Sequence, residues 1–228
     1  MRKTFEIEIQ QLLDEVILLG SMVESAILNS VDALKKRDLD ASHQLYAMDQ
    51  QVNAHRYEIE EKVMITIATQ QPAARDLRLL ASILEVAGEL ERMGDYAKGI
   101  AKVSILLGDQ PLLKPLVDIP LMAKKCADML HRSLVAFINE DVEAARIIPP
   151  EDDEVDALYN QVYRDLMTYV MADAKSIEPA NRLLWVAHNL ERVSDRVTNI
   201  CERIVFVVTG EILELDQSDD ELRVPRNA

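Results

Sequence analysis

The sequence predicts an all-α protein built as two tandem antiparallel three-helix bundles that are related by an internal duplication. Its 228 residues include only six glycines and 4% aromatic residues, whereas a β-sandwich or barrel needs turn residues every ~8 to 12 positions. Apolar residues recur in alternating steps of three and four, which is the period of a buried helix face. Short motifs recur about 100 residues apart, which indicates a repeated structural unit.

Three helices are expected in the first half. The first carries an apolar seam over residues 5–26 and ends at a charged Lys-Arg-Asp segment. The second opens with an Asp-Leu-Asp-Ala step at residues 38–41 and runs to a Gln-Gln-Pro break at 70–72. The third carries a seam over residues 79–100 and ends near Gly108, before a stretch that contains three prolines.

Three more helices are expected in the second half. The fourth follows the proline-containing stretch, and the fifth opens with Asp-Val-Glu-Ala at residues 141–144. Pro149 and Pro150 are expected to kink the fifth helix. The sixth follows Ile-Glu-Pro at residues 177–179, and its seam over residues 183–207 alternates steps of three and four without interruption. A length of about 30 residues is expected for each helix.

The internal repeat divides these six helices into two bundles. The step at residue 38 recurs at Asp141, 103 residues later. The Leu-Glu-Arg-x-x-Asp motif that begins at Leu90 recurs at Leu190, 100 residues later. The loop between the second and third helices of the unit is therefore three residues shorter in the second copy. The sequence leaves open whether the two bundles lie end to end or side by side.

We expect a first domain at residues 1–108 and a second at residues 109–228, the second with a short polar C-terminal tail after Glu211. Before that tail, residues 204–208 are all apolar, more than a helix seam requires. This segment is either a fully buried helix end or a surface for a dimer or another partner.

Charge excludes several functions. Acidic residues outnumber basic ones by 40 to 25, and the net charge is −15, which disfavours nucleic acid and anionic lipid as partners.

No uninterrupted apolar run approaches the ~18 residues of a membrane span, and the N-terminal sequence does not resemble a secretion signal. The two cysteines, Cys126 and Cys201, are far apart and fit a reducing compartment. We expect a cytoplasmic protein without direct membrane insertion.

Oxygen-bearing side chains cluster once in each half. A pair of them one turn apart on the third helix of the unit faces a similar pair on the second helix, if those helices form an antiparallel hairpin. The hairpins are expected to turn at residue 72 and between residues 173 and 174. The first carboxylate set comprises Asp49, Asn53, Glu91 and Asp95. The second carboxylate set comprises Asp152, Asp156, Glu191 and Asp195.

Four such side chains on neighbouring helices repel one another unless something neutralises them. A hard cation does so, since Mg²⁺, Mn²⁺, Fe and Ca²⁺ take carboxylates, whereas Zn²⁺ usually recruits Cys or His. Asn53 lowers the charge of the first set. Nearby arginines offer a structural alternative, because ion pairs neutralise acids without a metal. These arginines are Arg75, Arg78, Arg92, Arg192 and Arg196.

Other candidate sites are weaker. His188 shares a helix face with Glu191 and Asp195, either as a further ligand or as a partly exposed histidine beside Trp185. The chain contains no Glu-x-x-His motif, which the ferritin-like di-iron proteins use. It also lacks the Gly-x-x-x-x-Gly-Lys-Ser/Thr loop that cradles phosphates.

The chain resembles the PhoU family of accessory proteins of bacterial phosphate-specific transport. The resemblance rests on the duplicated Leu-Glu-Arg-x-x-Asp motif, the Pro-Ala-Ala-Arg-Asp-Leu-Arg run at residues 72–78, the helix-opening steps and the two three-helix halves. It covers nearly the whole chain. It implies a PhoU-like fold and metal clusters bound by the two carboxylate sets, with iron, manganese, magnesium and zinc all open as the metal.

The resemblance also implies a function. Such a protein is a negative regulator of the phosphate-starvation (Pho) regulon and a modulator of phosphate uptake, and not an enzyme. It acts as a metal-binding scaffold between a phosphate ABC transporter and its sensor histidine kinase, often as a homodimer, and is peripheral at the inner membrane through these partners. The residues themselves leave a second class open, a metal-dependent hydrolase or metal-storage bundle that uses the same carboxylates.

Overall fold

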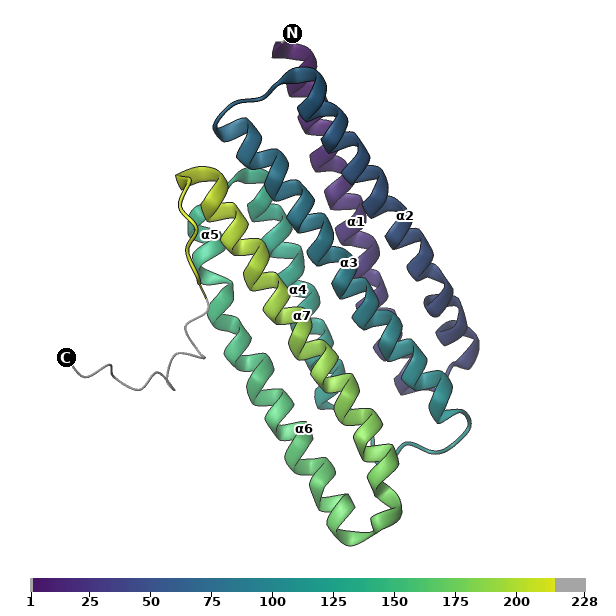
Figure 1. Cartoon of the computed structure of the whole chain (residues 1–228). Coiled ribbons are helices and arrows are strands. Elements are labelled where there is room, and N and C mark those ends of the chain that lie inside the picture. The colour runs from purple at the N-terminus through teal and green to yellow at the C-terminus, as the bar shows by residue number, and fades with distance from the viewer. Residues whose placement is uncertain (1, 216–228) are drawn as a thin grey trace, which may run out of the picture.

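The computed structural model describes residues 2–215, and every regular element among them is helical (Figure 1). The all-α prediction is confirmed. The elements are α1 (Arg2–Lys36), α2 (Leu39–Gln70), α3 (Arg75–Leu107), α4 (Asp118–Asn139), α5 (Val142–Ile147), the 3₁₀ turn η1 (Pro149–Glu151), α6 (Asp152–Ala172), the 3₁₀ turn η2 (Ala174–Ser176) and α7 (Ile177–Thr209).

The two three-helix units lie side by side and not end to end (Figure 1). Helices α1, α2 and α3 pack together, as do α4, α6 and α7. Between the units, α3 packs against α7 and α1 packs against α4, which leaves α2 and α6 on the outside. The buried apolar side chains of both units form one contiguous core. The structure thus decides the arrangement that the repeat alone left open.

The apolar seams account for this packing. In α7, Leu190, Val193 and Val197 have no exposed surface, and in α3 the same holds for Ile83 and Leu90. Burying one such side chain stabilises a fold by roughly 1.5–3 kcal/mol relative to leaving it exposed. Because α3 and α7 each carry a seam of this kind, their mutual contact removes a large apolar area from water.

The duplicated helix-opening steps are N-caps. The Asp38 carboxylate accepts a hydrogen bond from the backbone N–H of Ala41 at 2.9 Å, and the Asp141 carboxylate accepts one from Ala144 at 3.0 Å. Each cap satisfies a backbone donor at the first turn of a helix that has no intrahelical partner. The repeat in sequence is therefore a repeat in local structure.

Pro149 and Pro150 break the fifth predicted helix more completely than a kink. Helix α5 ends at Ile147, a 3₁₀ turn covers the prolines, and α6 begins anew at Asp152. Neither proline can donate the backbone hydrogen bond that continues an α-helix. Because of this break, the expected length of about 30 residues is wrong for α6, which has 21 residues. The expected length is also wrong for α4, which has 22 residues.

Helix α1 contains an 18-residue window that is long and apolar enough to span a membrane, with a mean hydropathy of 1.4. The apolar residues of α1 are interrupted by Asp14, Glu15 and Glu24, so the window passes on average hydropathy and not as an unbroken apolar run. The side chains of Val16, Leu19, Val23 and Ile27 have no exposed surface, because they face the core between α3 and α4. The apolar character of α1 thus follows from its inner position in the bundle.

The apolar segment before the C-terminal tail is a buried helix end. Ile204, Val205 and Val207 are at most 1% exposed, Phe206 is half-buried, and Val208 is 39% exposed. The polar tail predicted after Glu211 lies mostly outside the described residues, which end at Leu215.

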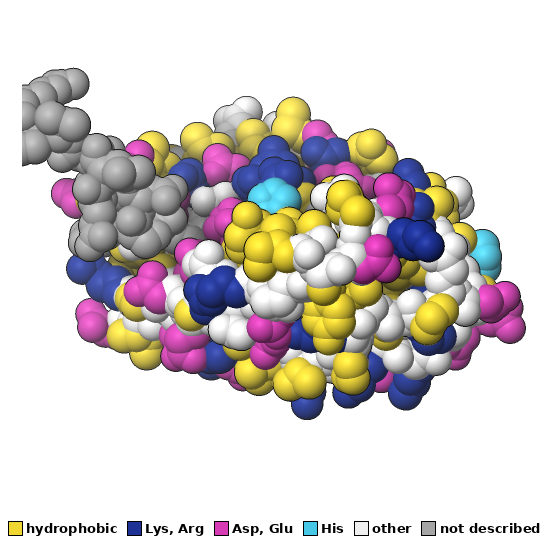
Figure 2. Space-filling model, turned by 90° about the horizontal axis from the view of Figure 1, so that it is seen from below, with side chains coloured by type: hydrophobic (Ala, Val, Ile, Leu, Met, Phe, Trp, Pro, Cys, Tyr) yellow, Lys and Arg dark blue, Asp and Glu magenta, His cyan; other side chains and the backbone are white. Residues whose placement is uncertain are grey.

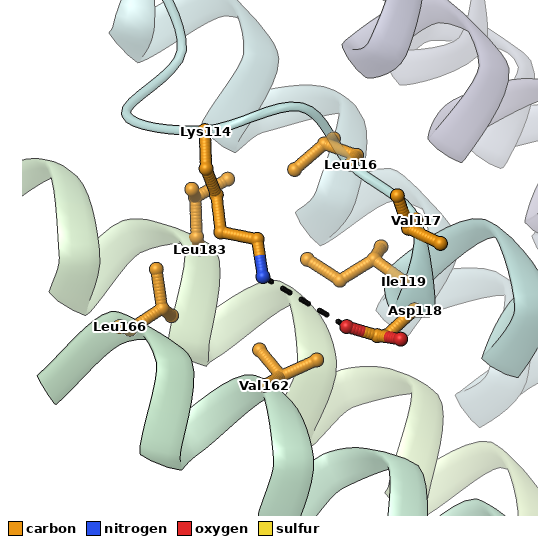
Figure 3. Close-up of a pocket in the computed structure, with 8 residues that line it drawn as sticks. All are labelled: Lys114, Leu116, Val117, Asp118, Ile119, Val162, Leu166 and Leu183. Atoms are coloured by element: carbon orange, nitrogen blue, oxygen red, sulfur yellow. Dashed lines mark ion pairs between the residues drawn. The ribbon is translucent and has the colours of Figure 1, made fainter. Parts of the chain in front are cut away.

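The connection between the two units is anchored on the second one. Figure 3 shows Lys114 pointing toward apolar side chains of α4, α6, α7 and the connection itself. These residues line a small cavity of about 10 Å³. Its ammonium pairs with Asp165 of α6 and lies 3.8 Å from Asp118 at the start of α4. Hydrogen bonding to Lys114 lowers the pKa of Asp165.

Close approach of α3 to α7 depends on Gly99, and the substitution Gly99→Ala tests it. A Cβ at this position would lie 2.5 Å from Cη2 of Trp185, so the indole must move away from α3. We expect a loss of about 1–2 kcal/mol of stability and a red shift of fluorescence, since Trp185 is the one tryptophan of the chain. Thermal unfolding and emission spectra measure both effects.

Gly88→Ala in the same helix is the matched control. A Cβ there meets no atom within 4 Å, and alanine favours a helix over glycine by about 0.5–1 kcal/mol. Gly88→Ala should therefore raise the melting temperature and leave the emission spectrum unchanged. Equal effects of the two substitutions would contradict the packing argument.

Candidate functional site

The hairpin of α2 and α3 brings the first carboxylate set together. The ammonium of Lys98 lies between its members, 2.6 Å from Oδ2 of Asp49 and 3.6 Å from Oδ1 of Asp95. The Asn53 amide donates a second hydrogen bond to the same Asp49 oxygen at 3.0 Å. The Asp49 side chain is only 4% exposed, so a buried carboxylate is held by two N–H donors, one from the next turn of α2 and one from α3.

Glu91, which lies one turn before Asp95 on α3, completes the first carboxylate set. Burial raises the pKa of the Glu91 carboxyl, and the nearby negative charges of Asp95 and Asp49 raise it further, against the opposing effect of Arg56 and Arg92. The coupling of Glu91 to both aspartates agrees with the antiparallel register expected from the sequence.

The hairpin of α6 and α7 holds the second carboxylate set. Asp152 stands in the first turn of α6 and is 9% exposed, whereas Asp156, Glu191 and Asp195 are half-buried. The ring centroids of Tyr159 and His188 are 6.2 Å apart across this hairpin. This pair lies on the same register that was expected to place Asp156 opposite Glu191.

Helix α4 contributes a buried thiol beside the second carboxylate set. Burial raises the pKa of Cys126, and the negative charges of Asp152, Asp195 and Glu191 raise it further. Three carboxylates from two helices therefore act on one interior point. The thiol donates a hydrogen bond to the Leu190 carbonyl at 3.2 Å.

Neither cysteine is suited to nucleophilic catalysis. Cys126 and Cys201 are both buried and unpaired, and burial raises the pKa of Cys201 to about 12. A thiol acts as a nucleophile or a metal ligand in its thiolate form, which these surroundings disfavour at neutral pH.

The two sets differ in how well they fit a metal. Among residues 2–215, no three His, Cys, Asp or Glu side chains are arranged so that they hold a metal ion. In the first set, the Lys98 ammonium already takes the place of a cation beside Asp49 and Asp95, so this set does not fit a metal. The second set consists of four carboxylates, the donors that hard cations take, so the chemistry of its side chains, though not their arrangement, fits such a cation.

Each of the arginines considered as neutralising partners also contacts a group outside the two sets. Their contacts are Arg75 with Glu140, Arg78 with the Val207 carbonyl, Arg92 and Arg196 with Glu89, and Arg192 with the ring of Tyr96. Glu89 is only 9% exposed, so its pairing with arginines of α3 and α7 links the two units.

The His188 ring lies beside a member of the second set. Its Nδ1 lies 3.1 Å from Oε2 of Glu191, and its side chain is 49% exposed. The contact agrees with the shared helix face seen in the sequence, and a ligand role for His188 stays a prediction.

Sequence reasoning missed Lys98 and Cys126. Lys98 lies three residues after Asp95 and seven after Glu91, on the same face of α3, so the helical period already carried the signal. Cys126 reaches its set from a different helix, and no local spacing in the sequence indicates that contact.

Comparison with known proteins agrees with this geometry. The family model described as PhoU domain matches residues 16–104 and residues 119–204. These two matches span the helices of the two three-helix units, without the connection that Lys114 anchors. The chain belongs to the PhoU family.

PhoU relatives align over nearly the whole chain. Homologues of the phosphate-specific transport system accessory protein PhoU from Caulobacter vibrioides and Aquifex aeolicus are 36% and 35% identical to it. The alignments cover 92% of this chain and 92% of the Caulobacter protein, and 91% and 94% in the Aquifex case.

Solved PhoU structures share the fold. The crystal structure of PhoU from Pseudomonas aeruginosa superimposes with a TM-score of 0.85 at 30% identity and covers 91% of this chain and 100% of that one. The phosphate transport system regulatory protein PhoU from Streptococcus pneumoniae gives a TM-score of 0.84 at 30% identity, with 92% and 99% covered. The predicted PhoU-like fold and the family resemblance are confirmed.

The start of α6, and with it Asp152, is held by an ion pair that depends on pH. Arg132 of α4 donates to both carboxylate oxygens of Glu151, at 2.8 and 2.5 Å. These bonds lower the pKa of Glu151 from 4.5. Because the folded-state pKa is the lower one, the pair stabilises the fold above about pH 4.5, and this contribution is lost as the pH falls through the folded-state pKa.

Glu151→Gln should therefore cost about 1 kcal/mol at neutral pH, as is typical of a partly exposed pair, and the difference from the wild type should vanish at acidic pH. Urea unfolding between pH 3 and pH 7 measures this. Glu143→Gln, at an exposed acid of α5, is the control. A difference that persists unchanged at the acid end would refute the ion-pair explanation.

Proposed function

We propose that this protein is an accessory regulator of phosphate transport, which represses the phosphate-starvation response by binding a sensor histidine kinase and a phosphate ABC transporter. The observation that carries the proposal is that both halves match the PhoU domain. Full-length relatives carry the name of an accessory protein of the phosphate-specific transport system, and one solved relative is described as a phosphate transport system regulatory protein.

The fold supports a scaffolding mechanism. One contiguous core joins the two units, so the protein offers a single rigid platform to two partners at once. A scaffold transmits the state of the transporter to the kinase if its affinity differs between states, and a few kcal/mol of difference shifts the populations strongly. We place the protein in the cytoplasm, as a homodimer that reaches the membrane through its partners.

One end of the molecule has the surface character of a protein contact site. Figure 2 shows apolar side chains there among charges of both signs. Large exposed side chains at the turns of this end include Met171 at 82%, Val117 at 68% and Ile177 at 55% exposure. Apolar groups surrounded by charge are typical of surfaces that bind other proteins, which supports docking onto protein partners and not onto lipid.

The proposal includes a cation held by the second carboxylate set. Its four acids come from two facing helices, and hard cations such as Mg²⁺, Mn²⁺ and iron bind this type of donor. Bound there, a cation would neutralise the clustered charge and join α6 to α7. The names of the relatives describe accessory and regulatory proteins, which favours this structural use of a metal over a hydrolase or a storage protein.

Deletion of the gene tests the regulatory role. We expect phosphate-starvation genes to be expressed in high phosphate, since no scaffold would couple transport to the kinase. The tagged protein should also retain the kinase and the ATP-binding subunit of the transporter from membrane extracts, and light scattering should give the mass of a dimer. Normal repression in the deletion strain would overturn the proposal.

Metal content tests the second carboxylate set. Protein purified without chelator should contain metal, and Glu191→Gln with Asp195→Asn should lower that content at least tenfold, because two of four oxygen donors lose their charge. The control is Asp153→Asn with Glu178→Gln, which removes the same charge from exposed positions of α6 and α7. Equal metal content in all three proteins would remove this site.

A further inference from the structure

The two carboxylate sets occupy equivalent places in the repeat but differ at two positions. Asn53 of the first set corresponds to Asp156, and Lys98 beside it corresponds to Thr198. The first set therefore combines three carboxylates with one ammonium, whereas the second has four carboxylates and a neutral hydroxyl. The duplicated backbone carries two different charge arrangements.

The Lys98 ammonium is built into the first set. It donates to Asp49 at 2.6 Å and lies 3.6 Å from Asp95, with only 30% of its side chain exposed. The nitrogen also lies 5.6 Å from the centre of the Tyr46 ring, which favours a cation. A lysine side chain ordinarily carries a positive charge at neutral pH, and hydrogen bonding to Asp49 raises the pKa of Lys98.

The surroundings strengthen this pair. The Lys98 stem and Asp49 line a small apolar pocket with Met22, Val52 and Ala97. Water screens a charge pair poorly in such a place, so a competing ion has to displace an ammonium that is already hydrogen-bonded. The other oxygen of Asp49 is buried and accepts no hydrogen bond from the described residues. This single oxygen does not make a metal site, because Mg²⁺ or Mn²⁺ coordinates about six ligand atoms.

We propose that Lys98 is the permanent counter-ion of the first carboxylate set and excludes metal from it, so that this chain binds metal through the second carboxylate set alone. The inference rests on the metal-binding part of the proposed function. Metal occupancy is then a property of the second unit.

Conversion of the first set into a copy of the second provides the test. The double substitution Asn53→Asp with Lys98→Thr reproduces the residue types of the second set position by position. Manganese bound per chain, measured by equilibrium dialysis, should rise about twofold over the wild type, because a second complete donor set becomes available. Circular dichroism verifies that the variant is folded.

Three further variants separate the gain of a metal site in the first set from a general effect of removing charge. Lys102→Thr removes the same charge from an exposed position one turn further along α3, and should leave manganese binding unchanged. Asp95→Asn alone, in the first set, should also leave the metal content of the wild type unchanged, whereas Glu191→Gln with Asp195→Asn should abolish it.

The outcomes distinguish the two proposals. Suppose that the wild type binds manganese. If the double variant then binds no more, or if Asp95→Asn lowers binding, Lys98 does not exclude metal, and this inference fails while the proposed function stands. If the wild type binds no manganese, the metal-binding part of the proposed function fails. In that case, manganese binding by the double variant would still support the role of Lys98, whereas no binding by the double variant would overturn it.

Discussion

The burial of the apolar seams of α3 and α7 against each other is the constraint on which the rest of the structure depends. Each helix presents apolar side chains every three or four residues, and those at Leu90 and Leu190 have no exposed surface. Burying the apolar side chains of both seams against each other requires the two units to lie side by side. It also moves α2 and α6 to the outside, where each buries only one face.

This layout explains where the carboxylate sets lie. Each set spans one inner and one outer helix, α3 with α2 and α7 with α6, at the edge of the core. Their acids are therefore partly desolvated, which raises the pKa of Glu91, yet they stay within reach of solvent. A position of this kind suits either a bound cation or a built-in ammonium, since both relieve the repulsion between carboxylates.

The two halves show that the same backbone supports different electrostatics. The cap at Asp38 and the cap at Asp141 have the same geometry, and both units match one family model. Lys98 and its counterpart Thr198 nevertheless give the two carboxylate sets different charges. Local structure in this fold follows from apolar period and capping, so charged residues at the hairpins vary without disturbing it.

The sequence by itself determined the helices and their antiparallel hairpins, because apolar period, capping residues and prolines act over a few residues. Tertiary structure decided the side-by-side arrangement and brought Cys126 of α4 within the electrostatic influence of the second set. It also decided that Lys98 turns toward Asp49 and not toward solvent. These features depend on contacts between helices that are far apart in the chain, and no local pattern specifies them.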